Sequence, residues 1–346
     1  MKILQMCDVR WYNANAHYVV ELARGLRAAG HEVTLWAREH TPIVSKAEAA
    51  GIPVVSHRRG DPFKLLRLWW LVKRGKYDIV NAHRGSDLFL VMLLKSILSV
   101  QVVVTRSDIR PFKNNAINRY FFAEQVDQVI LSGKFHLEQG MMSPFTILDE
   151  CITVIPLGIE MPPIEPVSSL PPDRLRLVLV GRFDPVKGHQ TVLEAFRLLQ
   201  REFPQTELGF IGYPAAIDAA ELRRQAAGLP VTIIDHQVDI VSTLARYQIG
   251  IIASSASEAV PRAGLEYLSR GMPVVGTRIN SIPELIEDGV NGLLVPPDDP
   301  EAMAGALIRI CREYGAFKEG VRRSRDRYSM MKMVQATVTT YRRLLP

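Results

Sequence analysis

Short apolar runs alternate with amphipathic stretches along almost the whole chain. An apolar run at residues 2–7 precedes a stretch at 17–30 whose apolar residues recur at helical spacing, and a second apolar run follows at 31–37. A strand, a helix and a strand in this order form a βαβ unit, in which the two strands are parallel. The same pattern predicts further strands at residues 77–83, 102–106, 128–133, 152–158, 174–182, 206–212, 231–235, 249–254 and 272–277.

A proline-rich stretch interrupts this alternation near the middle of the chain. Residues 160–173 contain five prolines, and proline fits neither a helix interior nor a sheet ladder. The stretch therefore predicts a linker between two α/β domains, residues 1–165 and 166–329. The predicted fold class is a pair of doubly wound, Rossmann-like domains that face a central cleft, because open α/β sheets bind ligands at the carboxyl ends of their strands.

The composition is that of an ordinary globular protein. Hydrophobic residues make up 47% and charged residues 23% of the 346 residues. The longest apolar stretch, 88–105, is interrupted by Lys95 and predicts a buried helix followed by a buried strand. The chain opens with MKILQMC and without the layout of a signal peptide, which predicts a cytoplasmic protein. Three cysteines, far apart in sequence, predict buried thiols and neither a zinc site nor a disulfide framework: Cys7, Cys151 and Cys311.

Positive charge is concentrated in one segment of the first half. Residues 57–76 hold seven Lys or Arg and a single acid, Asp61, while the net charge of the whole chain is +6. Phe63, Trp69 and Trp70 lie among these cations, a combination that suits an anionic membrane surface or a phosphorylated acceptor. The alternative interpretation is an amphipathic helix with aromatic residues in the core and a solvated basic face. We therefore hypothesise that this segment binds the protein peripherally to the inner face of the cytoplasmic membrane.

Two cations between a predicted strand and a predicted helix are candidates for binding phosphate. In VGRFDPVKGHQ, residues 180–190, Arg182 follows the strand and Lys187 precedes the helix. A helix N-terminus attracts anions, arginine can bind two oxygens and lysine adds a point charge, so these groups together fit a diphosphate. The alternative is a pair of surface cations where a helix begins. The chain contains neither a Walker loop nor a GxGxxG motif.

Two glutamates follow the strand predicted at 249–254. Glu258 lies in the loop, and Glu266 lies in the helix that begins near Pro261. This separation suits two parts of one extended ligand, such as a nucleotide sugar. Glu266 can then accept hydrogen bonds from ribose, Glu258 can lie beside the sugar, and the N–H groups of residues 260–263 can hold the sugar or its phosphate. A glycosidase is the competing interpretation, but this placement gives no reason for the two carboxylates to flank one glycosidic bond.

These motifs resemble those of the retaining glycosyltransferases of family 4, which have the GT-B fold. The matching segments include GRFDPVKG at 181–188, GFIG at 209–212, and residues 257–295, which contain the family's Glu-x7-Glu motif at Glu258 and Glu266. They cover most of the second half of the chain. The resemblance implies that this half is the nucleotide-sugar-binding domain.

The resemblance also implies roles for individual residues. Arg182 and Lys187 are expected to contact the donor diphosphate, Glu266 the ribose, and Glu258 the donor sugar, so that Arg182, Lys187 and Glu258 are the expected catalytic residues. The loop at 235–239 is expected to receive the base. The donor-binding set implied in this way is Arg182, Lys187, His236, Gln237, Glu258, Val260, Pro261, Arg262, Ala263 and Glu266.

The first half resembles the family more loosely. The resemblance implies that it is the acceptor-binding domain, with a C-terminal helix at about 330–346 packed back on it. The family commonly has a Gly-Gly loop where this chain has NANAH at 13–17, and often a histidine where it has TRSDIRP at 105–111. For His83 a structural role is the alternative. The acceptor-side candidates are Asn13, Asn15, His17, His83, Arg106 and Asp108.

The predicted function is retaining transfer of a sugar from a UDP- or GDP-sugar to a glycan or lipid-linked acceptor, in lipopolysaccharide or cell-envelope polysaccharide synthesis. No DxD motif follows a predicted strand, and cations with a helix N-terminus can stabilise the leaving diphosphate, so neither a metal nor a cofactor is expected. The resemblance implies front-face attack, with the leaving phosphate accepting the acceptor's proton. Nucleic acid is not an expected partner. Two alternatives stay open: a nucleotide-sugar epimerase of the same fold and a non-catalytic nucleotide-sugar-binding protein.

Overall fold

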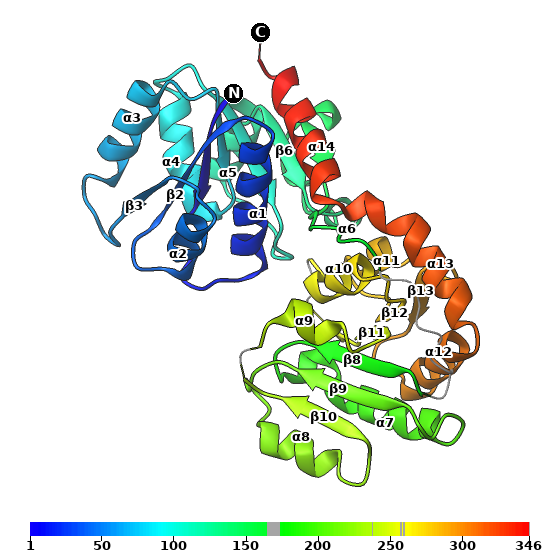
Figure 1. Ribbon diagram of the computed structural model, residues 1–346. Coiled ribbons are helices and arrows are strands. Elements are labelled where there is room, and N and C mark those ends of the chain that lie inside the picture. Colours follow the sequence, from blue (N-terminus) through cyan, green and yellow to red (C-terminus); the bar gives the residue numbers. More distant parts are fainter. Residues whose placement is uncertain (165–173, 237, 257, 259, 346) are drawn as a thin grey trace. The chain divides into compact units, whose positions relative to one another are not determined.

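The computed structural model describes residues 1–164, 174–236, 238–256, 258 and 260–345. Contacts between residues divide the chain into two compact units (Figure 1). The first unit consists of Met1–Gly158 and Tyr328–Pro346, and the second of Ile159–Arg327. Most of the predicted linker, residues 165–173, lies outside the described residues.

The first unit is built on a parallel sheet with the strand order β3-β2-β1-β4-β5-β6-β7. The strand order reverses between the neighbours β1 and β4, and in open α/β sheets ligands bind beyond the carboxyl ends of the strands at such a reversal. The loops that follow β1 and β4 therefore lie where a ligand is expected. The strands are β1 (Lys2–Cys7), β2 (Glu32–Arg38), β3 (Val54–His57), β4 (Ile79–Ala82), β5 (Gln101–Arg106), β6 (Gln128–Leu131) and β7 (Ile152–Val154).

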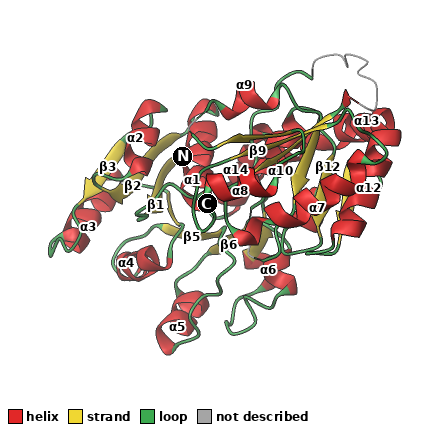
Figure 2. Cartoon of the chain, turned by 90° about the horizontal axis from the view of Figure 1, so that it is seen from below, coloured by secondary structure: helices red, strands yellow, loops and turns green. Residues whose placement is uncertain are grey.

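Helices cover both sides of this sheet (Figure 2). On one side, α3, α4 and α5 bury Leu68, Val91 and Phe121 in one cluster with strand residues such as Met6 and Val104. On the other side, α1, α2 and α14 pack beside one another. The helices of the unit are α1 (Ala14–Ala28), α2 (Pro42–Ala49), α3 (Lys64–Gly75), α4 (Gly85–Lys95), α5 (Ala116–Glu124), α6 (Phe135–Glu138) and α14 (Met330–Arg343), with a 3-10 turn at Asp149–Cys151.

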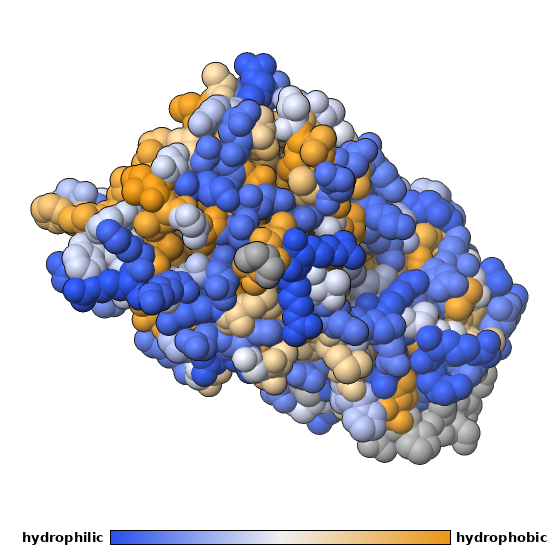
Figure 3. Space-filling view, turned by 90° about the horizontal axis from the view of Figure 1, so that it is seen from above, coloured by the Kyte–Doolittle hydropathy of each residue, from blue (hydrophilic) through white to orange (hydrophobic). Residues whose placement is uncertain are grey.

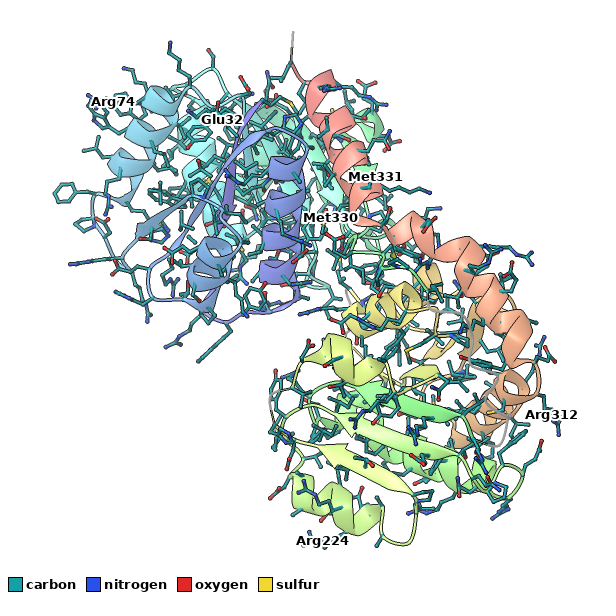
Figure 4. All side chains as sticks on the ribbon, in the orientation of Figure 1. Glu32, Arg74, Arg224, Arg312, Met330 and Met331 are labelled. Carbon is teal, nitrogen blue, oxygen red and sulfur yellow. The ribbon has the colours of Figure 1, made fainter. Side chains whose placement is uncertain are left out.

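The last helix of the chain, α14, belongs to the first unit and lies beside α1 (Figure 1). A Cβ on Gly25 of α1 would lie 2.4 Å from Val334 Cγ2 and 3.0 Å from Met330 Sδ, so the two helices pack closely only because this position is glycine. Figure 4 shows Met330 on the side of α14 that faces α1. Met331, by contrast, is 71% exposed.

The second unit repeats the same architecture with the strand order β10-β9-β8-β11-β12-β13, again all parallel. The strands are β8 (Arg176–Val180), β9 (Glu207–Ile211), β10 (Val231–Ile234), β11 (Ile249–Ile252), β12 (Val274–Thr277) and β13 (Gly292–Val295). The helices are α7 (His189–Gln200), α8 (Ala219–Gln225), α9 (Ile240–Leu244), α10 (Arg262–Ser269), α11 (Ile282–Leu285), α12 (Pro300–Arg312) and α13 (Tyr314–Ser324), with 3-10 turns at Pro185–Lys187 and Arg325–Tyr328.

Several features differ from the sequence analysis. The hydrophobic pattern did not reveal β3, α2 or β13. Both strands are four-residue edge strands, and the residues of β3 are mostly half-buried. The apolar stretch at 88–105 was expected to begin with a buried helix, but Phe89 of α4 is 53% exposed and Ile97 just beyond it 67%. Only one side of α4 packs on the sheet, and the other presents apolar side chains to solvent.

Candidate functional site

The loop that follows β8 carries the two predicted phosphate-binding cations. Asp184 begins the short helix Pro185–Lys187 by accepting a main-chain hydrogen bond at 3.1 Å. Gly188 has a φ of +69°, and a Cβ there would lie 2.2 Å from the main-chain oxygen of Ala253. Glycine therefore lets this loop pass close to the end of β11, which brings Lys187 to the residues that follow β11.

The carboxylate of Glu258 pairs with Lys187. Lys187 Nζ lies 2.5 Å from Glu258 Oε2, and Ser254 Oγ donates a hydrogen bond to the same oxygen at 2.9 Å. The main chain of Glu258 is also held, because its N–H donates to Asn280 Oδ1 at 3.1 Å and its carbonyl accepts from Ser281 Oγ at 2.8 Å. The structure thus brings together two of the three predicted catalytic residues, at the ends of the neighbouring strands β8 and β11.

Arg182 is the third of these residues. Its guanidinium lies 3.7 Å from the carboxylate of Asp184, and 53% of its side chain is exposed. Ion pairs this long and this exposed are weak. A bound anion can therefore compete with Asp184 for the guanidinium.

Glu266 lies one turn inside α10, with only 16% of its side chain exposed. Burial raises its pKa, and the charge and hydrogen bond of Arg262 partly oppose this shift. Arg262 Nε lies 2.9 Å from Glu266 Oε1. The carboxylate is therefore held on the surface of α10 by a single, half-exposed arginine, which a hydroxyl-bearing ligand can supplement.

The start of α10 differs in detail from the expectation that the N–H groups of residues 260–263 are free. Pro261 is the residue before the helix, where it has no N–H to offer, and the N–H of Arg262 donates to the carbonyl of Val260 at 2.8 Å. Of the four predicted groups, those of Pro261 and Arg262 are thus not free donors, and donation by Val260 and Ala263 to a ligand stays a prediction. The signal that revealed this helix, a proline near its start, also removes one of its donors.

The loop expected to receive the base is only partly described. His236 is 73% exposed in its side chain and lies 3.7 Å from Asp235, which is paired with Arg223 at 2.9 Å. Gln237 lies outside the described residues. A role of this loop in base binding stays a prediction.

The acceptor-side candidates all lie in the first unit, close to the carboxyl ends of β1, β4 and β5 or at the start of α1. Asn13 caps α1 by accepting from the N–H of Ala16 at 3.0 Å. Asn15 is buried and fully engaged, since its Nδ2 donates to the carbonyl of His83 at 3.0 Å and its Oδ1 accepts from Ser107 Oγ at 3.0 Å. His17 lies beside Tyr12, with 3.4 Å between His17 Nδ1 and the Tyr12 hydroxyl.

His83 belongs to a buried polar network. Its Nε2 lies 2.6 Å from Gln5 Oε1, and Gln5 in turn reaches the hydroxyl of Tyr341 from α14, which also accepts from Asn81 Nδ2 at 2.7 Å. Burial lowers the pKa of His83 to about 3, so its imidazole is neutral at physiological pH. This geometry agrees with the structural alternative for His83, whose acceptor-side role stays a prediction.

Arg106 is the last residue of β5, and Asp108 lies two residues beyond it. Their side chains do not form an ion pair with each other. Arg106 is 8% exposed and lies over the ring of Phe112 at 4.5 Å, and it donates to the carbonyl of Arg110. The carboxylate of Asp108 binds the guanidinium of Arg110 instead, at 2.9 Å. Burial lowers the pKa of Arg106, and the nearby charges of Arg110 and Arg84 lower it further, although Asp108 opposes them.

Sequence reasoning missed a group of charged residues centred on Asp8. The carboxylate of Asp8 lies 2.8 Å from Arg38, 3.1 Å from Lys64 and 3.6 Å from His57. Burial by itself raises the pKa of Asp8, but the hydrogen bond and charge of Lys64, with Arg38 and His57, bring it below its usual value. The signal was present: Asp8 continues the inward-facing series of alternate β1 residues, a position where a charged residue requires partners.

A second buried carboxyl group, that of Asp87, lies in the first turn of α4. Its Oδ2 accepts from the N–H of Asp8 at 3.3 Å, and the residue has no exposed surface. Burial raises the pKa of Asp87 to about 7, helped by the charge of Asp8 and opposed by Lys64 and Arg84. The carboxyl group therefore titrates near physiological pH.

Two models of protein families match the chain, one on each half. The model described as Glycosyltransferase Family 4 matches residues 16–161, and that described as Glycosyl transferases group 1 matches residues 174–313. The chain belongs to the family 4-type glycosyltransferases. Its two parallel sheets give it the GT-B fold, and the enzyme class is that of a glycosyltransferase. The family does not favour the epimerase or the non-catalytic binding protein.

Individual relatives agree with this assignment. The chain is 25% identical over 327 residues to a phosphatidyl-myo-inositol mannosyltransferase of Mycolicibacterium smegmatis, covering 86% of this chain and 80% of the relative. It is 23% identical over 304 residues to a D-inositol 3-phosphate glycosyltransferase of Saccharomonospora viridis, covering 78% and 70%. Its fold is similar to a crystal structure of the Anabaena protein HepE in complex with UDP, with a TM-score of 0.84, 18% identity, and coverage of 99% of this chain and 100% of that one.

Two further features concern membrane-spanning helices and metal-binding side chains. No helix among the described residues combines the length and the apolar character that crossing a bilayer requires. Within the same residues, no group of three or more His, Cys, Asp or Glu side chains is placed to hold a metal ion.

Proposed function

We propose that the chain transfers a sugar from a nucleoside diphosphate sugar to an acceptor hydroxyl with retention of the anomeric configuration. One observation supports the donor site above all others: Lys187 and Glu258 lie 2.5 Å apart at the ends of neighbouring strands. Arg182 lies in the same loop as Lys187, and Glu266 lies in the helix that follows Glu258. This order of charges along the strand ends matches the order of sugar, diphosphate and ribose in such a donor.

The chemistry follows from where charge develops. When the bond from the anomeric carbon to the diphosphate breaks, negative charge grows on the leaving oxygen, and Lys187 and Arg182 stabilise it. Lys187 leaves Glu258 to do so, which frees the Glu258 carboxylate to bind the hydroxyls of the sugar. In front-face attack the leaving phosphate accepts the acceptor's proton, so the site needs neither an enzymatic base nor a metal.

The nucleotide is proposed to be UDP or GDP. The similarity in fold to a structure that contains UDP makes UDP the first nucleotide to test. Glu266 serves the ribose in either case, because both nucleotides present the same two ribose hydroxyls. The base-binding loop around His236 decides between them.

The acceptor is proposed to be a glycan or a lipid-linked molecule of the cell envelope, including lipopolysaccharide as one setting. Relatives that are named for phosphatidyl-myo-inositol and for D-inositol 3-phosphate support an acceptor of this kind. The acceptor-side candidates lie in the first unit, at the sheet edge where open α/β folds bind ligands. The cytoplasmic face of the membrane is the location that this acceptor implies.

The outer side of α3 supports binding to an anionic membrane. Leu68 and Val72 face the core, whereas Leu66 is 53% and Trp70 43% exposed, and Phe63 just before the helix is 64% exposed. In Figure 3, orange hydrophobic patches lie among blue hydrophilic side chains on the left, the side where Figure 1 shows α3. This arrangement differs from the alternative in which both tryptophans are buried, and it suits a headgroup layer.

Cations border these apolar side chains. Arg74, at the end of α3 in Figure 4, lies 4.0 Å from the ring of Trp70, and Lys73 lies 4.5 Å from the ring of Trp69. Each such cation near an anionic membrane surface contributes about 1 kcal/mol to the free energy of membrane binding. Lys64, which begins α3, is excluded from this set because Asp8 binds it.

A thermal-shift screen tests the donor site. We expect UDP or GDP, each with and without EDTA, to raise the melting temperature, because a ligand at 100 times its dissociation constant adds about 2.7 kcal/mol of stability. Glu266→Ala should lose most of this increase, since it removes a charged acceptor worth about 1.5–3 kcal/mol. Glu194→Ala, on the solvent-exposed side of α7, is the matched control. A shift that needs magnesium, or one that Glu266→Ala leaves unchanged, contradicts the proposed site.

Vesicle sedimentation tests the membrane surface. Wild-type protein should bind anionic vesicles at low salt, and Lys73→Gln with Arg74→Gln should reduce this binding. The control is Arg342→Gln with Arg343→Gln, which removes the same charge from exposed positions of α14, on the other side of the sheet. Equal binding by both double variants means that net charge alone attracts the protein and that α3 has no special role.

A further inference from the structure

Charged residues lie at or just beyond the carboxyl ends of four neighbouring strands of the first sheet. The buried residues Trp36, Met6, Ala82 and Val104 lie in register across β2, β1, β4 and β5. Residues two apart along a strand point to the same side of a sheet. Two positions beyond this row come Arg38, Asp8, Arg84 and Arg106. The carboxyl edge of the sheet therefore presents three arginines and one aspartate side by side.

The single aspartate of this row is already neutralised. Asp8 binds Arg38 at 2.8 Å and Lys64 at 3.1 Å. Among the described residues, Arg84 and Arg106 have no carboxylate within 4.0 Å of their guanidinium nitrogens. The row consequently carries uncompensated positive charge at its β4–β5 end.

Arg106 is the more unusual of these two arginines. It is more than nine-tenths buried, and its Nε has no hydrogen-bond partner among the described residues. Among the described residues its guanidinium donates a hydrogen bond only to a neutral group, the carbonyl of Arg110. The nearest carboxylate, that of Asp108, is bound by Arg110. A buried guanidinium that no carboxylate contacts directly is costly, and a bound anion lowers this cost.

Arg84 adds a second source of attraction for an anion. It is the residue before α4, an 11-residue helix whose first two residues, Gly85 and Ser86, are exposed. The N-terminus of a helix of this length carries partial positive charge and free N–H groups. Among the described residues the Arg84 side chain forms neither a hydrogen bond nor an ion pair, so its guanidinium is available to the same ligand.

We propose that Arg84, Arg106 and the start of α4 bind a phosphate group of the acceptor, so that the substrate class is a phosphate-bearing molecule. The inference rests on the glycosyl transfer proposed above and specifies its acceptor. The phosphate belongs either to a soluble phosphomonoester or to the headgroup of a lipid. In both cases it orients the acceptor hydroxyl from the carboxyl edge of the first sheet.

Calorimetry with a soluble probe tests this site. The full-length protein is first saturated with the nucleoside diphosphate that stabilises it, which occupies the donor site, and is then titrated with glycerol 1-phosphate or with glycerol at low salt. We expect binding of glycerol 1-phosphate alone. Arg84→Gln should weaken it at least fivefold, Arg84→Lys should restore part of it, and Arg342→Gln should leave it unchanged.

Vesicles that contain phosphatidylinositol distinguish the two sources of phosphate. If Arg84→Gln weakens binding of glycerol 1-phosphate but not of these vesicles, the site takes a soluble phosphate. If Arg84→Gln also weakens vesicle binding as much as the Lys73→Gln, Arg74→Gln double variant does, the site takes the lipid headgroup. If Arg84→Gln changes neither, the inference is wrong. A protein that binds no nucleoside diphosphate at all would instead contradict the proposed donor site.

Discussion

Asp87 gives the first unit a pH dependence that a single substitution can remove. An unfolded chain loses the Asp87 proton near pH 4, whereas burial in the folded protein keeps it up to about pH 7. The unfolded state therefore binds fewer protons between these values, and the free energy of unfolding falls as pH rises from about 4 to about 7. Below pH 4 the carboxyl group is protonated in both states and has no effect.

We expect Asp87→Asn to be more stable than the wild type at pH 8, by on the order of 4 kcal/mol, and to lose most of this advantage at pH 4. The amide keeps an oxygen that accepts the Asp8 N–H without carrying a charge. All four tryptophans lie in the first unit, at positions 11, 36, 69 and 70, so urea unfolding followed by tryptophan fluorescence measures this unit. Asp149→Asn, at an exposed site, is the control, and equal gains at both pH values would mean that Asp87 is ionised throughout.

At the scale of residues, the sequence was most informative for site residues whose position is set by the strand just before them in the chain. Lys187 and Glu258 were predicted to lie together because each follows the end of a predicted strand, and parallel strands bring their ends together. The Asp8 group was missed because its members come from four separate segments of the chain. Their proximity depends on the strand order, and in particular on β3, which the hydrophobic pattern did not reveal.

At the scale of elements, the loop between β8 and α7 depends on one glycine. Gly188→Ala should lower the stability of the second unit by about 2 kcal/mol or more, because alanine disfavours the positive φ and its Cβ would lie 2.2 Å from the Ala253 oxygen. The same change should displace Lys187 and weaken nucleotide binding. Calorimetric unfolding measures the first effect and the thermal shift by UDP or GDP the second.

Gly305→Ala is a matched control for this element. Gly305 lies inside α12, and a Cβ there would meet no atom within 4 Å. Alanine favours a helix over glycine by about 1 kcal/mol, so this variant should be slightly more stable than the wild type. If both glycine variants lose stability to the same extent, the close approach at Gly188 is not what holds the loop.

At the scale of the whole molecule, α14 completes the first unit from the far end of the chain. Tyr341→Phe should lower the stability of this unit by about 1–3 kcal/mol, because it leaves the buried Asn81 amide without its partner at 2.7 Å. Tryptophan fluorescence during urea unfolding measures the change. Tyr120→Phe is the control, since Tyr120 is 54% exposed, and equal losses in the two variants would contradict the role of the network.

The overall architecture was predictable because parallel α/β sheets repeat a simple alternation of apolar and amphipathic segments. The GT-B fold and the family followed from the alternation and the motifs of the second half, and both are confirmed. The sequence could not show whether Trp70 of α3 is buried or exposed, because tryptophan suits a core and an interface equally well. Burial of that kind depends on how α3 packs on a core whose members come from distant segments of the chain, which no local pattern encodes.

The return of α14 to the first unit has a consequence for biosynthesis. A ribosome releases residues 1–158 long before it releases Tyr341, and the hydrogen bond from Gln5 to Tyr341 spans 336 positions. The second unit is continuous in sequence, so its nascent chain contains every strand of its sheet before the first unit has its last helix. Domains usually complete their folding in the order of synthesis. In this protein the part that is made first is completed last, and until α14 has left the ribosome the side of α1 that α14 covers stays open to solvent and to chaperones.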